Sequence, residues 1–390
     1  MKKAVVLGGG IGGVEAAISL KKEGFDVELI SDRDYVYIYP ISIWIPTGEV
    51  SLSDVALPLH EVAKAHNFTF TKDKVVSISG KENKVVLENR GEKTDFDYLI
   101  IALGQTKLKH KGIENTLSIC GSPEEALKIK KKLDELIEKG FGKIAFGFGG
   151  NPKAPDAVRG GPVFEVMFNV HNYLKKLHLR DKFDITFFAP MPKPGARLGE
   201  TALKLMDKMF KKMNIKKITG KKIKEFEKDK VILEDDTKIE ADLIAFTPAG
   251  DGHPVIKESD LPKTEAGFLL IDEGCQVLNH ENIYAIGDSV AIEGPEWRAK
   301  QGHLAEVMGR ITANNIAVKE GIKEGRIESY KRHINIMCLM DTGDGGALAY
   351  RSDTKALLIP LPIIGHWMKK AWGLYYKLSK LGKIPRLPGM

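Results

Sequence analysis

The residues whose chemical use is easiest to assign are the glycines near the N-terminus, Gly8-Gly9-Gly10-Ile11-Gly12-Gly13. An apolar strand pattern (4–7) precedes them and a helical pattern (14–22) follows them. In this strand–turn–helix context, G-x-G-x-x-G makes a tight turn at its first glycine. It brings the backbone close to a pyrophosphate at the second and packs helix against strand at the third. The spacing therefore predicts a dinucleotide-binding loop.

The next apolar strand, 27–30, ends at Ser31, Asp32 and Arg33. In such a unit an acidic group is expected to meet the ribose about 20 residues after the glycines. Ser31 occupies the usual position and Asp32 follows it, so either residue can serve. Arg33, beside them, is included among the expected cofactor-binding residues.

A second glycine turn, Gly147-Phe148-Gly149-Gly150, follows the apolar run 143–146 and precedes another helical pattern. Its third glycine is replaced by Pro152, and Pro155 follows. Proline has no backbone N–H and cannot contribute the amide donors that hold a pyrophosphate. We therefore do not expect nicotinamide to bind at this second turn.

The chain has three cysteines, Cys120, Cys275 and Cys338. They are too few and too far apart in the sequence for a disulfide scaffold or a zinc site, so no metal is expected. Cys275, in an apolar strand region, is interpreted as a small buried hydrophobe. Cys338 lies in the glycine-rich stretch CLMDTGDGG, where a thiol is expected to be accessible.

Two further apolar strands end in glycine turns, at Gly104 in DYLIIALG and at Gly287-Asp288 in ENIYAIGD. Together with the first glycine loop, in this order and spacing, they resemble the two-dinucleotide-domain flavoproteins of the pyridine nucleotide–disulfide oxidoreductase type. The resemblance covers nearly the whole chain and implies FAD as the cofactor. The first loop would bind the ADP half of FAD, and Asp288 the ribityl chain.

This resemblance implies an α/β fold with two Rossmann-like dinucleotide-binding domains. The FAD domain would be discontinuous, formed by 1–110 and 250–325, with a second Rossmann-like domain at 111–249 and a flavin-capping, membrane-associated region at 326–390. A helix starting near Gly302 would direct its N-terminus at the flavin. Together with the Lys300 ammonium it would favour the anionic reduced ring and keep a nearby thiol ionised.

The stretch RGGPVFEVMFNVHNYL narrows the resemblance. It is similar to the sulfide:quinone oxidoreductases and to the flavoprotein of flavocytochrome c sulfide dehydrogenase, in which a Gly-Pro step precedes an aromatic–Glu pair. Cys120 matches the first cysteine of that family and Cys338 the last, which lies over the flavin. Arg159 stands at the place of the middle cysteine. Glu165, more often a helix-surface residue, would relay protons near the flavin.

Since the middle and last cysteines form the redox pair in that family, Arg159 leaves three alternatives. Cys338 works alone, or Cys120 becomes its partner, or the donor is not sulfide. The resemblance implies oxidation of sulfide, or a related small sulfur donor, with electron transfer to a membrane quinone. The alternatives are a type II NADH:quinone oxidoreductase, a cytochrome-coupled sulfide dehydrogenase flavoprotein, and a non-catalytic FAD-binding subunit.

The composition of the 390 residues, with 43% hydrophobic residues and a net charge of +7 spread along the chain, indicates a globular protein and does not favour nucleic acid as a partner. No apolar run reaches the ~18 residues of a membrane-spanning helix. The apolar start ends at Leu7, which favours a first strand over a signal peptide. The sequence leaves open the side of the membrane and the oligomeric state, a homo-oligomer included.

The C-terminal stretch 361–386 predicts an amphipathic helix that lies on a membrane surface. At 100° per residue one face is apolar and aromatic, and the other carries lysines that we expect to meet anionic lipid. The apolar face consists of Ile364, Trp367, Met368, Ala371, Trp372, Tyr375 and Leu378. The basic face consists of Lys369, Lys370, Lys377 and Lys380, with Lys383 and Arg386 just beyond.

Overall fold

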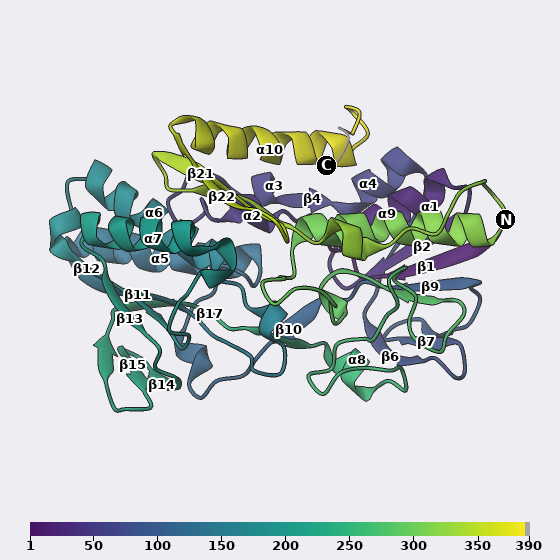
Figure 1. The fold of residues 1–390 in the computed structure, drawn as a ribbon, viewed down its shortest axis with the longest axis horizontal. Coiled ribbons are helices and arrows are strands. Elements are labelled where there is room, and N and C mark those ends of the chain that lie inside the picture. Colours follow the sequence, from purple (N-terminus) through teal and green to yellow (C-terminus); the bar gives the residue numbers. More distant parts are fainter. Residues whose placement is uncertain (387–390) are drawn as a thin grey trace.

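A computed structural model describes residues 1–386, and the last four residues of the region 326–390 lie outside it. The chain forms two β-sheets, each made of parallel strands, which lie side by side with helices on their faces. A C-terminal sheet and helix lie across one side of the molecule (Figure 1).

The first sheet has the order β19-β9-β1-β2-β5, with every neighbouring pair parallel. Its strands are β1 (Lys3–Leu7), β2 (Asp26–Ser31), β5 (Thr69–Lys72), β9 (Tyr98–Ile101) and β19 (Ile283–Ala285). The central strands are apolar throughout and buried, as expected for a parallel sheet covered on both faces. Because β19 comes from late in the chain, two distant segments build this sheet.

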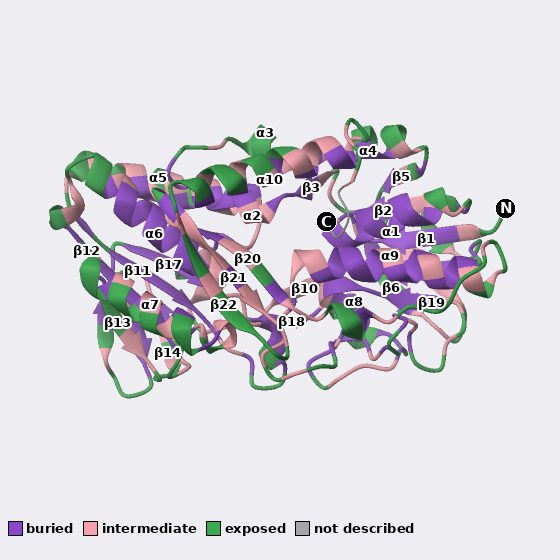
Figure 2. Ribbon diagram, turned by 45° about the horizontal axis from the view of Figure 1, so that its top comes forward, coloured by how far each residue is buried: buried purple, intermediate pink, exposed green. Residues whose placement is uncertain are grey.

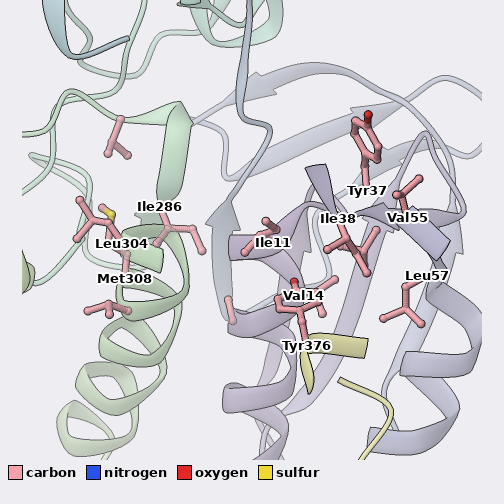
Figure 3. Packing of buried hydrophobic residues seen from close by; sticks show 14 of the residues in the cluster. Ile11, Val14, Tyr37, Ile38, Val55, Leu57, Ile286, Leu304, Met308 and Tyr376 are labelled. Carbon is pink, nitrogen blue, oxygen red and sulfur yellow. The ribbon is translucent and has the colours of Figure 1, made fainter. Parts of the chain in front are cut away.

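Helices α1 (Ile11–Lys22) and α9 (Gly302–Lys319) pack against each other beside this sheet, and α4 (Leu59–His66) follows β4. Almost every residue of α1 is buried. Figure 3 shows the apolar side chains that meet at this place, from α1, α9, the β3–β4 region and, through Tyr376, the C-terminal helix. The core of the first unit therefore includes the end of the chain.

The second sheet has the parallel order β13-β12-β11-β17. Its strands are β11 (Gly142–Phe148), β12 (Phe183–Ala189), β13 (Lys216–Thr219) and β17 (Leu243–Thr247), and its helices are α5 (Pro123–Lys139), α6 (Gly161–Lys176) and α7 (Glu200–Lys212). A cluster of phenylalanines fills the space between this sheet and its helices, with Phe164 and Phe187 stacked at 4.9 Å. The second unit thus keeps a full Rossmann-like core.

Smaller elements connect these layers. Antiparallel ribbons are formed by β3 (Tyr35–Tyr37) with β4 (Ala56–Pro58), by β10 (Gln105–Lys107) with β18 (Gly250–Gly252), by β6 (Val75–Ser79), β7 (Lys84–Leu87) and β8 (Gly91–Lys93), and by β14 (Ile223–Glu227), β15 (Lys230–Leu233) and β16 (Lys238–Glu240). The short helices are α2 (Tyr39–Ser42), α3 (Leu52–Val55) and α8 (Pro254–Glu258).

The C-terminal layer is an antiparallel sheet of β20 (Ile336–Asp341), β21 (Gly345–Arg351) and β22 (Ala356–Pro362), followed by α10 (Ile364–Lys380). Helix α10 contacts all three strands and α2, and Figure 1 shows it as the outermost element on this side. No helix in the described part of the chain is long and apolar enough to cross a membrane.

Candidate active site

The first glycine loop has the geometry of a phosphate cradle. Gly8 has φ +110°, which favours glycine, and a side chain at Gly13 would collide with the Gly8 carbonyl oxygen. In contrast, a Cβ at Gly10 would meet nothing within 4 Å. Helix α1 begins just after Gly10, and no side chain caps the amides of its first turn. These features fit the pyrophosphate of a dinucleotide.

The residues after β2 differ in accessibility. Ser31 is buried behind the loop, where its Oγ accepts a hydrogen bond from the Arg33 amide at 3.2 Å. Asp32 is exposed. The guanidinium of Arg33 lies 5.8 Å from the centre of the Tyr35 ring. Asp32 is therefore the accessible carboxylate for a ribose, whereas Ser31 supports the loop from behind.

The turns after β9 and β19 meet at the same carboxyl edge of the sheet. The Ser289 Oγ accepts from the Gly104 amide at 2.8 Å, and both Gly104 and Gly287 have positive φ. Asp288 lies next to this bond and pairs with Arg159. In open parallel sheets, ligands bind outside the carboxyl ends of the strands. The residues expected to hold FAD thus come together from three separate segments.

The loop that replaces the second nucleotide cradle, 149–160, bonds to the first unit. Asn151 Nδ2 donates to the Gly250 carbonyl at 2.9 Å, and Lys153 pairs with Glu265. Asp156 lies 3.7 Å from Lys300 Nζ, and Arg159 pairs with Asp288. Helix α6 starts only at Gly161, well after β11 ends at Phe148. This loop therefore joins the two units and does not form a turn over a pyrophosphate.

The surroundings of Lys300 bear on its expected role. Its ammonium is buried, donates to the Val290 carbonyl and faces Asp156 and the Phe268 ring. Burial lowers the pKa of Lys300. Gly302 starts α9 as predicted, close to the Tyr39 hydroxyl. Lys300 is not among the groups that act on Cys338, since burial and the Glu165 carboxyl raise the pKa of that thiol to about 12 and Lys369 acts against them. The role expected of Lys300 at the flavin stays a prediction.

The three cysteines are free thiols in three different surroundings. Cys338 lies in β20 opposite Ala349 and is half-buried, with Glu165 and Lys369 as its charged neighbours. Cys120 precedes α5. Burial raises the pKa of the Cys120 thiol, although Arg159, Thr247 and Lys107 act in the opposite direction. Cys275 is fully buried. The charged groups that act on the two thiols differ: Arg159 and Lys107 act on Cys120, whereas Glu165 and Lys369 act on Cys338.

Glu165 is not on the helix surface. Its side chain is buried, its Oε1 accepts from the Asp341 amide at 2.8 Å, and it pairs with Lys369 of α10. Burial raises the pKa of Glu165, against the effect of the Lys369 ammonium. A carboxyl group with a raised pKa beside a thiol is suited to accept and release protons.

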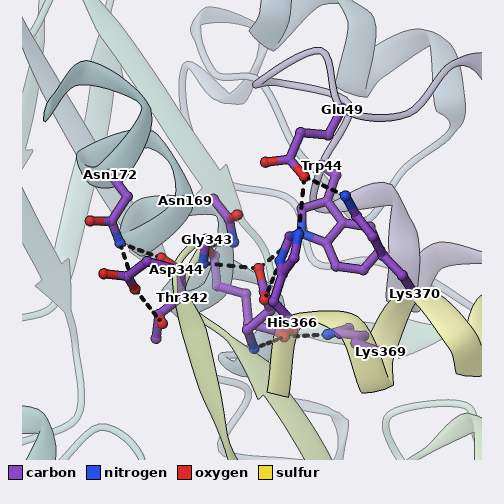
Figure 4. A network of polar contacts seen from close by, with 12 residues as sticks. Trp44, Glu49, Asn169, Asn172, Thr342, Gly343, Asp344, His366, Lys369 and Lys370 are labelled. Carbon is purple, nitrogen blue, oxygen red and sulfur yellow. Dashed lines mark hydrogen bonds and ion pairs between the residues drawn. The ribbon is translucent and has the colours of Figure 1, made fainter. Parts of the chain in front are cut away.

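A polar network that the sequence did not reveal continues from this pair (Figure 4). Asp341 Oδ2 accepts from Trp44 Nε1 at 2.8 Å, and Asp341 Oδ1 lies 2.8 Å from His366 Nδ1. His366 Nε2 lies 3.4 Å from Glu49, which pairs with Lys370 at 3.0 Å. Only the lysines of this network had been singled out, as members of a basic helix face. The available signal was a histidine directly before Trp367, followed by two lysines between Trp367 and Trp372.

Helix α10 is turned with its lysines inward. Lys369 pairs with Glu165, and Lys380 pairs with Glu15 and Glu306. Arg386 also pairs with Glu15. The expectation that these basic residues meet lipid is therefore wrong for Lys369, Lys380 and Arg386, because buried carboxylates on α1, α6 and α9 hold them.

Several segments of α10 are exposed (Figure 2), and Ile364, Trp367 and Met368 of its apolar face are among the exposed residues. Trp367 is 64% exposed, although Trp372 and Tyr375 are partly covered. The exposed large apolar residues of this layer are Met337, Leu357, Ile359, Ile363, Ile364, Trp367, Met368 and Leu374. Exposed large apolar residues gathered in one layer are typical of a site that meets a membrane or a partner.

Comparison with known proteins gives the same fold and family. Residues 2–321 match the family model described as pyridine nucleotide-disulphide oxidoreductase. The sulfide-quinone reductase of Aquifex aeolicus (strain VF5) is 28% identical, over 96% of this chain and 90% of that protein.

A type II NADH:quinone oxidoreductase of Staphylococcus epidermidis (strain ATCC 12228 / FDA PCI 1200) is 23% identical, over 90% of both chains. The crystal structure of the sulfide:quinone oxidoreductase from Aquifex aeolicus superposes with a TM-score of 0.87 at 25% identity, covering 98% of this chain and 92% of that one. With the cradle at Gly10 and the carboxyl-edge residues described above, the match identifies the chain as a member of the pyridine nucleotide-disulphide oxidoreductase family and as an FAD-dependent oxidoreductase.

Proposed function

We propose that the protein oxidises sulfide, or a closely related small sulfur donor, and passes two electrons to a membrane quinone. The observation that supports this choice over NADH oxidation is the loop 149–160. Its residues bond to Gly250, Glu265, Lys300 and Asp288, and two prolines interrupt its amides. A nicotinamide donor would need that loop as its cradle, whereas a sulfide ion needs only a thiol and a proton acceptor. The similarity to a sulfide-quinone reductase agrees with this choice.

FAD, when bound, supplies the two-electron chemistry that links donor and acceptor. We propose that the amides after Gly10, the Asp32 carboxylate, the Gly104 turn and Asp288 hold it. The Asp288 carboxylate also forms an ion pair with Arg159, so the loop 149–160 is bonded directly to a residue of the proposed FAD site.

At the donor side we assign the reacting sulfur to Cys338. Joining one hydrosulfide ion to the Cys338 thiol as a deprotonated persulfide forms a sulfur–sulfur bond and releases two electrons and two protons. Since burial and Glu165 raise the pKa of this thiol, its proton needs an acceptor, and the neighbouring Glu165 is placed for that role. Reducing one quinone to hydroquinone consumes two electrons and two protons, so the two sides balance.

Of the three alternatives for the cysteines, we propose that Cys338 acts alone, because its charged neighbours, Glu165 and Lys369, differ from those of Cys120. Cys338→Ser is expected to abolish reduction of the flavin by sulfide, because an alcohol cannot hold a sulfane sulfur. Cys275→Ser should leave the rate near that of the wild type. A loss with Cys120→Ser as large as with Cys338→Ser would contradict the single-thiol assignment.

We further propose that the protein lies on a membrane through the outer face of α10 and β22, as a peripheral protein. The test is substitution on that face, because removal of α10 would take Lys380 from the buried Glu15 and Lys369 from the buried Glu165. Trp367→Ser with Met368→Ser should weaken co-sedimentation with anionic liposomes and turnover with a long-chain quinone. The matched control is Phe141→Ser, which alters an apolar side chain of similar exposure on the second unit. Unchanged liposome binding would refute the anchor and favour a protein acceptor.

A further inference from the structure

His366 occupies an unusual position at the start of α10. Its ring lies between two carboxylates, Asp341 at 2.8 Å and Glu49 at 3.4 Å, and between two tryptophan rings, Trp44 at 5.3 Å and Trp367 at 5.9 Å. Only 12% of its side chain is exposed. Its two ring nitrogens therefore face carboxylates that differ in solvent exposure. Asp341 is fully buried, whereas the Glu49 side chain is 25% exposed. A ring placed in this way can take a proton on one side and give one on the other.

The charged groups around His366 come from four segments. Asp341 belongs to β20, Glu49 to the segment after α2, Glu165 to α6, and Lys369 and Lys370 to α10. The set consists of three carboxyl groups and two ammonium groups. Asp344, on the following turn, is bonded to Asn172 and Thr342 instead.

Asp341 links the histidine to the buried pair beside Cys338. Its carboxylate faces His366 Nδ1, and its backbone N–H holds Glu165 Oε1 at 2.8 Å. The ion pairs Lys369–Glu165 and Lys380–Glu15 are already sufficient to hold α10 against the rest of the protein. Docking therefore does not explain a titratable ring between two carboxylates.

We propose that His366 is the positioning residue through which the Glu165–Lys369 pair exchanges protons with water during quinone reduction. A proton enters at Glu49, passes through the imidazole to the Asp341 carboxylate, and moves from that carboxyl group to the adjacent carboxyl group of Glu165. There it replaces the proton that Glu165 gives up to the quinone. The inference rests on the quinone half of the proposed function and is independent of the electron donor.

The test uses the full-length FAD-loaded protein, reduced with dithionite under anaerobic conditions and mixed with decyl-ubiquinone. We expect His366→Ala to slow flavin reoxidation about tenfold or more above neutral pH and to flatten its pH profile. Imidazole added to the buffer should restore a large part of the rate. His60→Ala, at an exposed histidine on α4, should change neither the rate nor its response to imidazole.

A purely structural role of His366 would give a different result. Trp44→Phe removes a hydrogen bond to Asp341 without removing a titratable group and should keep the pH profile of the wild type. If His366→Ala does not fold, Glu49→Gln tests the outer acceptor and should flatten the same profile. Reoxidation at the wild-type rate, or a loss that is equal at every pH and insensitive to imidazole, would overturn the proposal. Failure of the wild type to reduce quinone would instead refute the proposed function.

Discussion

The first glycine loop, 8–13, and the second, 147–160, begin in the same way and end differently. Each follows a buried parallel strand and precedes a long helix. In the first, α1 starts directly after Gly10, no side chain caps its amides, and a Cβ at Gly10 would meet nothing within 4 Å. In the second, the chain continues through Asn151, Asp156 and Arg159, and each of them bonds to the first unit. A Rossmann-like unit can therefore keep its core while its loop changes from binding a ligand to joining two domains.

The largest effect is expected from placing the same side chain in both loops. Gly10→Val should abolish FAD binding, because the branched side chain fills the open space where the pyrophosphate approaches the backbone. Gly150→Val places it in the second loop, where the nearest atoms lie 3.6 Å from the added Cβ. That variant should keep full FAD occupancy, measured from the flavin absorbance of the purified protein. Equal loss of FAD in both variants would contradict the assignment of FAD to the first loop alone.

A smaller effect is expected from the ion pair that joins the second loop to the first unit. Asp156→Asn should lower the free energy of unfolding by about 1–3 kcal/mol, because the buried Lys300 ammonium loses its charge partner. Lys153→Gln removes an exposed pair of the same loop and should cost under about 1 kcal/mol. Urea denaturation of the two variants measures the difference. If Asp156→Asn is no more destabilising than Lys153→Gln, the loop does not hold the units together through this pair.

The smallest effect is expected in the pH dependence of folding stability, through a histidine on α6, the helix that follows the second loop. Burial and the nearby Arg180 lower the pKa of His171 to about 4 from its ordinary value of 6.5, and its Nδ1 accepts from Arg180 Nε at 2.8 Å. The unfolded chain thus binds this proton more tightly than the folded one. Stability should fall by about 1–2 kcal/mol as the pH drops from 6.5 towards 4.

The variant His171→Gln should remove that part of the acid sensitivity in thermal unfolding scans between pH 7 and 4.5. The exposed His178, just after α6, provides the control, since its replacement should leave the slope unchanged. A wild-type slope in His171→Gln would show that other groups carry the acid response.

The sequence predicted the features that depend on local pattern. The glycine loop at Gly8, the strand ends at Gly104 and Asp288 and the helix start at Gly302 carry their own signals of turn chemistry and periodicity. The family and FAD were predicted from the order of these motifs and are confirmed. The residue roles assigned to Cys338, Cys120 and Glu165 stay predictions.

The features that sequence reasoning missed depend on contacts between distant segments. The burial of Glu165 requires Lys369 and Asp341, which lie late in the chain. The helical wheel separated apolar from basic residues on α10 correctly, but it could not show which face meets the protein. Buried carboxylates at Glu15, Glu165 and Glu306 decide that orientation, since an unpaired buried charge would cost more than a lysine gains at a lipid surface.

The central claim is that electrons enter through a sulfur donor and not through a nucleotide held by the second loop. The most direct measurement is an anaerobic titration of the purified FAD-loaded protein, first with sulfide and, in a separate sample, with NADH, while the flavin absorbance is followed. The account predicts that sulfide bleaches the flavin band stoichiometrically and that NADH leaves it unchanged. Bleaching by NADH together with no response to sulfide would contradict it.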